Sequence, residues 1–444
     1  MSPTKPSLRS LLTLLTLVSS SFALLAAEDD YPRREAVEFR SRGGIPHVLA
    51  KIKEGAGREI RVAYLGGSIT AATGWRVKSL ALLQEKHPEV KLVEINAAIG
   101  GTGSDLGVFR FGQDVLKHRP DLLFVEFAVN DGGANPVQIH QAMEGIVRQA
   151  WTADAKTDII FVYTVSEPFL ADLQAGKFSR AASAMEEVAD HYGIPSIHLG
   201  IEVAKQAKEG SLIFKGVLPP KGSEPAPVSS LPFSTDGVHP LVETGHVLYT
   251  EAVGRAWEEL GKSKAEAADS PRLAGDPLRA DHWGKAKLVP LKKEMLSGEW
   301  TVLDGGESGD KIAKQFKRLM SEMWRASAPG ASLSFRFRGS VVGFYDLVGP
   351  DGGQLKVSLD GGEEKIFPRF DSYCTYHRLS KIQIGSGLDA ASDHTVSVTL
   401  DGTGPDKKTI LFEKNRPDFD KDPAKYAPNL WNVGAIMLIG EPVE

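Results

Sequence analysis

The sequence predicts an α/β domain with a doubly wound parallel sheet, followed by an all-β sandwich domain. From about Arg58 to Gly200, short apolar runs alternate with amphipathic stretches, which is the β-α pattern of a layered parallel sheet. After about Glu299, polar and apolar residues alternate in runs that end in Gly or Asp turns, as in antiparallel sandwiches. The chain has 444 residues, which is enough for two such domains.

The apolar runs of the first part are short and rich in β-branched or aromatic residues, which favours strands. Their apolarity is continuous, as expected where helices cover both faces of a parallel sheet. The runs are IRVAYL, KLVEINAA, DLLFVEFAV, DIIFVYTV and SIHL. The predicted helices are Trp75–Lys86, Leu106–His118, Pro136–Trp151, Phe178–Tyr192 and, after a loop rich in Pro, Gly and Ser, Leu241–Leu260.

The first residues have the features of a signal peptide. Lys5 and Arg9 precede an apolar stretch, Leu11–Ala27, and acidic residues follow from Glu28. We therefore expect an exported protein, located in the periplasm or outside the cell. The expected units are a signal peptide at 1–27, an α/β domain at 28–262, a linker at 263–295 and a jelly-roll-like β-sandwich at 296–444.

Composition and charge narrow the range of partners. The net charge is -5 and no cluster of Lys or Arg stands out, so a nucleic-acid partner has no electrostatic support. No stretch after the first is apolar enough to span a bilayer, so no membrane partner is expected after cleavage. The single cysteine, Cys374, cannot form an internal disulfide. The histidines lack metal-ligand spacing, and we expect neither a metal nor a cofactor.

Four segments at the predicted strand ends carry side chains or backbone groups that could do chemistry. Ser68 follows two glycines at the end of the first run. The turn NAAIGGTG ends the second run and could bind an oxyanion through its backbone N–H groups. Asn130 ends the third run and carries an amide donor. Asp236 and His239 lie three residues apart in STDGVHP, a spacing that lets a carboxylate orient an imidazole.

Each of these segments alone is a common kind of turn or helix cap. Together they map to one edge of the predicted sheet, because active sites of doubly wound folds lie beyond the carboxyl ends of the strands. They supply a nucleophile, a base, an orienting carboxylate and oxyanion donors. These are the roles that an acyl-transfer site needs.

In this order, the segments resemble the sequence blocks of the SGNH hydrolases, also called GDSL-type esterases. The similar blocks are Gly66–Thr70 (first), Asn96–Thr102 (second), Ala128–Asp131 (third) and Asp236–Pro240 (fifth). Gly67 stands where the family motif has Asp, and Ala128 stands where Gly is usual. The resemblance covers about Val62 to Leu248, near half of the chain, and implies a flavodoxin-like three-layer fold.

The resemblance also implies ester hydrolysis through a covalent acyl-enzyme, without a cofactor. Ser68 would be the nucleophile, His239 the base and Asp236 the residue that orients the base. The N–H groups of Ser68 and Gly101 and the amide of Asn130 would form the oxyanion hole.

Further residues near the strand ends are candidate substrate contacts: Trp75, Arg76, Asp131 and Glu167. An aromatic ring can pack on a sugar and Arg can bind an anion, whereas the alternative for Trp75 is a place in the core. Exported proteins that pair an SGNH domain with a β-sandwich are commonly polysaccharide O-acetyl esterases. By that analogy, the expected partner is an acetylated carbohydrate. In the sandwich, the candidates for glycan contacts or core positions are Tyr373, Tyr376, His377 and Trp431.

Two alternatives stay open at this point. A glycoside hydrolase on the same fold would use a carboxylate pair drawn from Asp131, Glu167 and Asp236. A glycan-binding surface protein would carry only a vestigial site.

Overall fold

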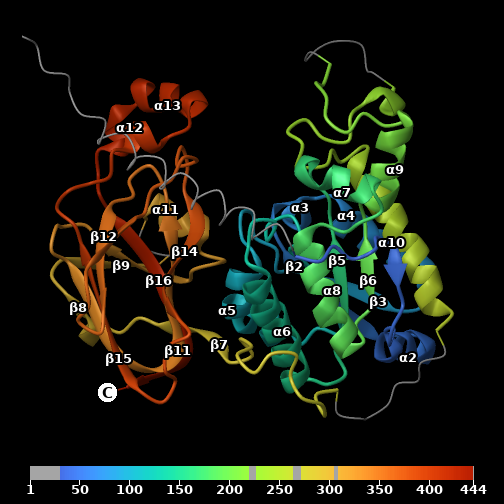
Figure 1. Ribbon diagram of the computed structural model, residues 1–444, viewed down its shortest axis with the longest axis horizontal. Helices are drawn as coiled ribbons and strands as arrows, with labels where there is room; N and C mark the ends of the chain where they lie inside the picture. Colours follow the sequence, from blue (N-terminus) through green and yellow to red (C-terminus); the bar gives the residue numbers. More distant parts are fainter. Residues whose placement is uncertain (1–30, 220–226, 264–271, 305–308, 444) are drawn as a thin grey trace, which may run out of the picture.

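A computed structural model of the protein describes residues 31–219, 227–263, 272–304 and 309–443. The chain forms an α/β part and an all-β part, each built on its own sheet (Figure 1). The predicted fold class is thereby confirmed, whereas the predicted signal peptide lies outside the described residues. Within those residues, no helix is both long and apolar enough to cross a bilayer.

The α/β part has a six-stranded sheet in the order β1-β6-β5-β4-β2-β3. Every pairing in it is parallel except that of β1 with β6. All residues of β4 and β5, the central strands, are buried, as expected for a sheet covered on both faces. The strands are β1 (Phe39–Arg40), β2 (Glu59–Gly66), β3 (Lys91–Asn96), β4 (Leu122–Glu126), β5 (Asp158–Tyr163) and β6 (Ser196–His198).

Helices cover both faces of this sheet. On one face lie α5 (Ser104–Asp114), α6 (Pro136–Ala153) and α8 (Arg180–Tyr192), and on the other lie α4 (Trp75–Lys86) and α10 (Gly245–Gly261). The predicted helix at Trp75–Lys86 has these bounds, and the other four predicted helices are found with shifted ends. The remaining helices are α2 (Pro46–Glu54), α3 (Ser68–Ala71), α7 (Leu170–Gln174) and α9 (Ile201–Glu209).

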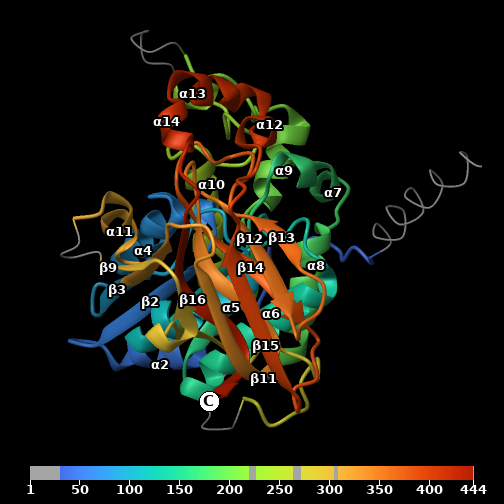
Figure 2. The ribbon, with the colours of Figure 1, turned by 90° about the vertical axis from the view of Figure 1, so that its left-hand side faces the viewer.

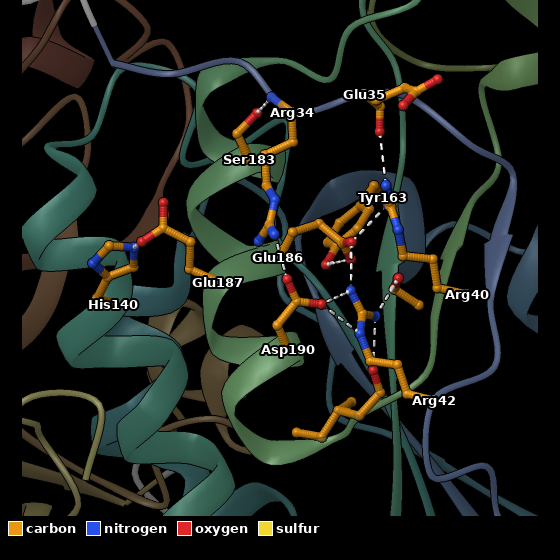
Figure 3. Close-up of polar contacts among 12 residues, drawn as sticks. Arg34, Glu35, Arg40, Arg42, His140, Tyr163, Ser183, Glu186, Glu187 and Asp190 are labelled. Atoms are coloured by element: carbon orange, nitrogen blue, oxygen red, sulfur yellow. Dashed lines mark hydrogen bonds and ion pairs between the residues drawn. The ribbon is translucent and has the colours of Figure 1, made fainter.

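A buried carboxylate, Glu186 on α8, binds two arginines in and just after β1, the edge strand of the sheet (Figure 3). Its side chain is shielded from solvent and forms ion pairs with Arg40 at 2.7 Å and Arg42 at 2.6 Å. It also accepts a hydrogen bond from the hydroxyl of Tyr163 at 2.8 Å. Arg42 pairs in addition with Asp190, one turn along α8. These contacts hold β1 against β6 at the edge of the sheet.

Replacing Glu186 by Gln is expected to lower the free energy of unfolding by about 3 kcal/mol, because the partly buried charges of Arg40 and Arg42 lose their shared partner. For a domain of this size, that loss lowers the Tm by about 6–12 °C, measured by thermal unfolding of the full chain. The matched control is Glu187→Gln on the same helix. The Glu187 side chain is 41% exposed, so the change should cost less than about 1 kcal/mol. Equal shifts for the two variants would contradict the expectation.

The all-β part is antiparallel throughout, and its two longest strands, β11 and β16, pair along most of their length. The first half of β11 also pairs with β15 and the second half with β14. The strands are β7 (Ala286–Pro290), β8 (Leu296–Ser297), β9 (Trp300–Asp304), β10 (Glu322–Ala326), β11 (Ser332–Val348), β12 (Gln354–Leu359), β13 (Lys365–Pro368), β14 (Arg378–Ser386), β15 (Asp393–Leu400) and β16 (Trp431–Val443).

Short helices accompany these strands: α11 (Lys311–Phe316), α12 (Lys407–Ile410), α13 (Arg416–Lys421) and α14 (Pro423–Tyr426). The last three form a cap between β15 and β16. Figures 1 and 2 show this cap toward the same end of the molecule as α7 and α9 of the α/β part.

The two parts meet along α5 and β7. β7 lies within the predicted linker and pairs with β16, so it belongs to the β-sheet of the second part. Close to it in the sequence, the backbone of Trp283 is bound to Gln141 of α6, and its ring packs against Phe109 of α5. An ion pair of 2.7 Å between Lys381 of β14 and Asp105 of α5 joins the parts again near the strand ends of the first sheet.

Candidate active site

Ser68 is the first residue of α3 and directly follows the turn that ends β2. The carboxylate of Glu126, at the end of the neighbouring strand β4, holds this turn. It accepts hydrogen bonds from the N–H of Gly67 and from the hydroxyls of Thr70 at 2.7 Å and Thr164 at 2.8 Å. Burial raises the pKa of Glu126 in spite of these bonds. The position of Ser68 is therefore set by a fully buried polar network beneath it.

Ser68, His239 and Asp236 form one hydrogen-bonded chain. Ser68 Oγ lies 2.8 Å from His239 Nε2, and His239 Nδ1 lies 2.7 Å from Asp236 Oδ2. The side chains of His239 and Asp236 are 51% and 53% exposed, so these hydrogen-bonded residues are accessible to solvent. In this geometry, the imidazole can take the proton of the serine hydroxyl and the carboxylate can stabilise the resulting imidazolium.

The loop of Asp236 is held by hydrogen bonds to the carboxylate itself. Asp236 Oδ1 accepts the N–H groups of Val238 and His239, both at 2.8 Å, and the hydroxyl of Ser234 at 3.0 Å. Partial burial opposes ionisation, but these bonds and the one from the His239 ring outweigh it. They hold the pKa of the Asp236 carboxyl well below its usual value.

Two glycines close to Ser68, Gly67 and Gly100, adjoin the predicted oxyanion donors. Gly101 has a φ of 74° in an exposed turn before α5, and a Cβ on the adjacent Gly100 would lie 3.6 Å from Ser68 Cβ. The side chain of Asn130 lies against Gly67, where a Cβ would be only 1.8 Å from Asn130 Oδ1. The absence of a side chain at Gly67 thus leaves the space that the amide of Asn130 occupies.

Replacing Gly67 by Ala is expected to lower kcat for ester hydrolysis by about 10²–10³-fold, because the new Cβ displaces the amide of Asn130 from its predicted place in the oxyanion hole. The backbone of Gly67 is extended, so alanine causes no backbone strain there. The matched control is Gly133→Ala in the loop after Asn130, where a Cβ meets nothing within 4 Å. Steady-state kinetics with p-nitrophenyl acetate measure both variants, and similar kcat values would contradict the prediction.

Comparison with known families agrees with this geometry. Residues 64–240 match the GDSL-like lipase/acylhydrolase family. This range covers most of the α/β domain and contains all five predicted catalytic and oxyanion residues. The match and the geometry of the site identify the protein as a carboxylic ester hydrolase that resembles the SGNH type. No curated protein sequence matches the chain significantly.

Solved structures with a similar fold align either with the SGNH domain or with nearly the whole chain. A two-domain esterase (CEX) active on acetylated mannans covers 92% of this chain and 98% of its own, with a TM-score of 0.68 and 19% identity. The same kind of esterase co-crystallised with mannopentaose covers 93% and 100%, with a TM-score of 0.67 and 19% identity. An acetylxylan esterase from Geobacillus stearothermophilus covers 49% of this chain and 99% of its own, with a TM-score of 0.34 and 18% identity. The two-domain matches establish the fold of both parts.

Two predicted substrate contacts of the SGNH domain are wrong. Trp75 is fully buried, and its ring packs edge-on against Tyr64 and Phe124. Arg76 is 4% exposed, donates to the carbonyl of Thr70 and forms an ion pair with Glu94. Both side chains stabilise the junction of α3 and α4 behind Ser68, so neither reaches a substrate.

Asp131 is also a wrong prediction as a substrate contact, because the residue is 3% exposed and its Oδ1 accepts the N–H of Ser104 at 3.0 Å. Glu167 is exposed and lies beside the loop of Asp236. Its N–H donates to the carbonyl of Gly237 at 2.7 Å, and its carboxylate pairs with Lys215 at 2.7 Å. A substrate contact by Glu167 stays a prediction.

Buried polar groups that the sequence analysis did not single out support the SGNH site from inside. Glu126 interrupts the apolar run DLLFVEFAV, and a carboxylate inside a buried strand is a signal for a satisfied polar network. Arg110 is a second such group: it is fully buried and donates to the carbonyls of Ala97 and Gly66, which joins the turn after β3 to the end of β2. Among the described residues, no three His, Cys, Asp or Glu side chains gather as metal ligands.

Proposed function

We propose that the protein is an exported serine esterase that removes O-acetyl groups from a polysaccharide. The observation that carries the proposal is the hydrogen-bonded chain from Ser68 through His239 to Asp236 at the carboxyl edge of the sheet. The other predicted groups are compatible with the same reaction, since Gly100, next to Gly101, lies close to Ser68, and Asn130 lies against Gly67.

The proposed reaction has two halves. His239 Nε2 takes the proton of Ser68 Oγ while the oxygen attacks the acetyl carbonyl, and the resulting oxyanion is held by Ser68 N–H, Gly101 N–H and the Asn130 amide. The imidazolium, stabilised by Asp236, then protonates the sugar oxygen as the ester bond breaks. Water attacks the acyl-enzyme, with His239 as base, releases acetate and restores the Ser68 hydroxyl.

The exposure of the site supports a polymeric substrate. His239 and Asp236 are about half exposed, so an acetyl group on a long chain can reach Ser68 without entering a closed pocket. The similar two-domain esterase is described as active on acetylated mannans, which supports the same substrate class here.

An exposed aromatic surface on the second domain supports a glycan as well. Tyr373 and Tyr376 are 52% and 56% exposed, and the guanidinium of Arg378 lies over both rings. Phe412 lies edge-on to Tyr373 along a groove of about 560 Å³. The planar rings of Tyr373, Tyr376 and Phe412 can pack on sugar faces.

The other two candidate residues of the second domain have partners inside the fold. His377 pairs with Asp351. Trp431 is buried in the core of the second domain, so the prediction of a glycan contact by Trp431 is wrong.

The contacts of the carboxylates favour an esterase over a glycoside hydrolase. Asp236 is bound to His239, Asp131 is buried, and Glu167 is paired with Lys215. None of the three is arranged as a free general acid opposite a second free carboxylate.

The test is acetate release from acetylated mannan, acetylated xylan and pectin by the purified mature protein. Release is expected from at least one of these polymers, with none from the Ser68→Ala variant. The double variant Tyr373→Ala/Tyr376→Ala should raise KM for the polymer while leaving p-nitrophenyl acetate hydrolysis unchanged. No acetate from any polymer by protein that hydrolyses p-nitrophenyl acetate would refute the substrate class. Mass spectrometry of the mature N-terminus, expected close to Glu28, tests export.

A further inference from the structure

Asp131 connects the two segments that carry the predicted oxyanion donors. It adjoins Asn130, and its Oδ1 accepts the N–H of Ser104, the first residue of α5. A Cβ on Gly103 would lie 2.3 Å from this oxygen, so the glycine before the helix lets the carboxyl approach. Asp131 Oδ2 is buried and has no hydrogen-bond partner among the described residues. The carboxyl therefore ties the Asn130 loop to the turn of Gly101 with one oxygen and leaves the other without a partner.

An ion pair extends this contact to the second domain. Asp105, the residue after Ser104, is the charged neighbour with the largest influence on Asp131. Its carboxylate pairs with Lys381 of β14 at 2.7 Å and is only 20% exposed. Figure 1 shows β14 on the side of the all-β part that faces α5. Lys381 of the second domain is thus connected to the Asn130 loop through two carboxylates, those of Asp105 and Asp131.

We propose that Asp131 is a positioning residue that locks the Asn130 loop to the first turn of α5, and that Lys381 of the second domain acts on this lock through Asp105. The inference rests on the acyl-transfer site proposed above. It goes beyond that site because it gives the second domain an influence on the reaction itself, separate from any contact with the substrate.

The protonation state of Asp131 determines whether this contact places a negative charge beside the oxyanion donors. Burial, the negative charge of Asp105 and, to a smaller extent, that of Glu126 raise the pKa of Asp131 to about 7, against hydrogen bonds from Ser104. Arg180 on α8 also contacts this loop, through two of its carbonyls. Below pH 7 the Asp131 carboxyl is neutral. Above pH 7 it adds a negative charge beside the donors that must hold an oxyanion, so kcat falls.

The same residue makes stability depend on pH. An aspartate in the unfolded chain loses its proton near pH 4, whereas Asp131 in the folded protein keeps it to about pH 7. The folded state therefore binds more protons than the unfolded state between these values, and its stability falls as the pH rises through this window. Replacing Asp131 by Asn removes this contribution, so the Tm of the variant relative to the wild type should rise from pH 4 to pH 7 and then stay constant.

The decisive experiment is the pH profile of kcat for p-nitrophenyl acetate in four full-length proteins. The wild type should show a decline centred near pH 7, and Asp131→Asn should lack it. Asp105→Asn removes a negative charge and should move the decline to lower pH by about one unit. Lys381→Met leaves Asp105 uncompensated and should move the decline to higher pH. Both of the last two variants break the same ion pair, so opposite shifts separate electrostatic coupling from loss of domain contact.

Two controls sharpen the result. Lys365→Met, on the edge strand β13, should leave the profile unchanged. Asp131→Ala should lose kcat at pH 6, and Asp131→Asn should recover most of it, because its amide oxygen can still accept the Ser104 N–H. A decline that persists in Asp131→Asn, or shifts of the same sign in Asp105→Asn and Lys381→Met, would overturn the inference. A wild type that does not hydrolyse p-nitrophenyl acetate would instead refute the proposed function.

Discussion

Replacing Ser68 by Ala is expected to lower kcat for ester hydrolysis about 10⁶-fold, because the attacking oxygen is lost and His239 has no nucleophile to activate. The residual rate comes from the oxyanion donors and from substrate binding alone. End-point and continuous assays with p-nitrophenyl acetate measure kcat of the variant and of the wild type. Labelling by a fluorophosphonate should disappear in the same variant.

The matched control for Ser68→Ala is Ser230→Ala. Ser230 is an exposed serine before the Asp236 loop, and its hydroxyl donates to the carbonyl of Pro227. This variant should keep the wild-type kcat and the wild-type labelling. More than about 1% of activity remaining in Ser68→Ala, with the fold intact by circular dichroism, would refute Ser68 as the nucleophile.

Replacing Asp236 by Asn is expected to lower kcat about 10⁴-fold with little change in KM. The amide nitrogen would donate to His239 Nδ1, so the ring proton would move to Nε2, which then could not accept the proton of Ser68. The amide oxygen can still accept the N–H groups of Val238 and His239, so the loop should keep its shape. Steady-state kinetics over the pH range 6 to 9 measure the effect.

The second domain provides a matched control for Asp236→Asn. Asp360 lies 2.8 Å from Nδ1 of His394, which is a carboxylate–imidazole pair of nearly the same geometry away from the site. Asp360→Asn should leave kcat within about twofold of the wild type, as expected of a surface substitution. A similar loss in both variants would point to general destabilisation and contradict the assigned role of Asp236.

The sequence predicts which residues lie close together when each of them directly follows a strand of the parallel sheet. Ser68 and Asn130 follow adjacent parallel strands, so their meeting at one edge of the sheet follows from the β-α pattern. The GDSL-like match over residues 64–240 agrees with the blocks recognised in the sequence. The hydrogen-bond distances in the chain to His239 depend on side-chain rotamers, which no spacing of residues determines.

The wrong predictions share a physical cause. Trp75, Arg76 and Asp131 lie next to the predicted site in the sequence, but a helix or turn points adjacent residues in different directions. Trp75 begins α4 with its ring in the core, and Asp131 points toward the start of α5. The cap of α12–α14 was not predicted either, because helices of four to six residues carry too little periodicity to be recognised.

The place of β16 in the sheet has a consequence for the order in which the two domains can fold. This strand spans Trp431–Val443 and pairs with β7, β10 and β11, which all precede it in the sequence. When the chain becomes available from its N-terminal end, the α/β domain has all its strands by His198. The second domain keeps unpaired strand edges until β16 is available, and a chain that stops before Trp431 would leave those edges open to aggregation.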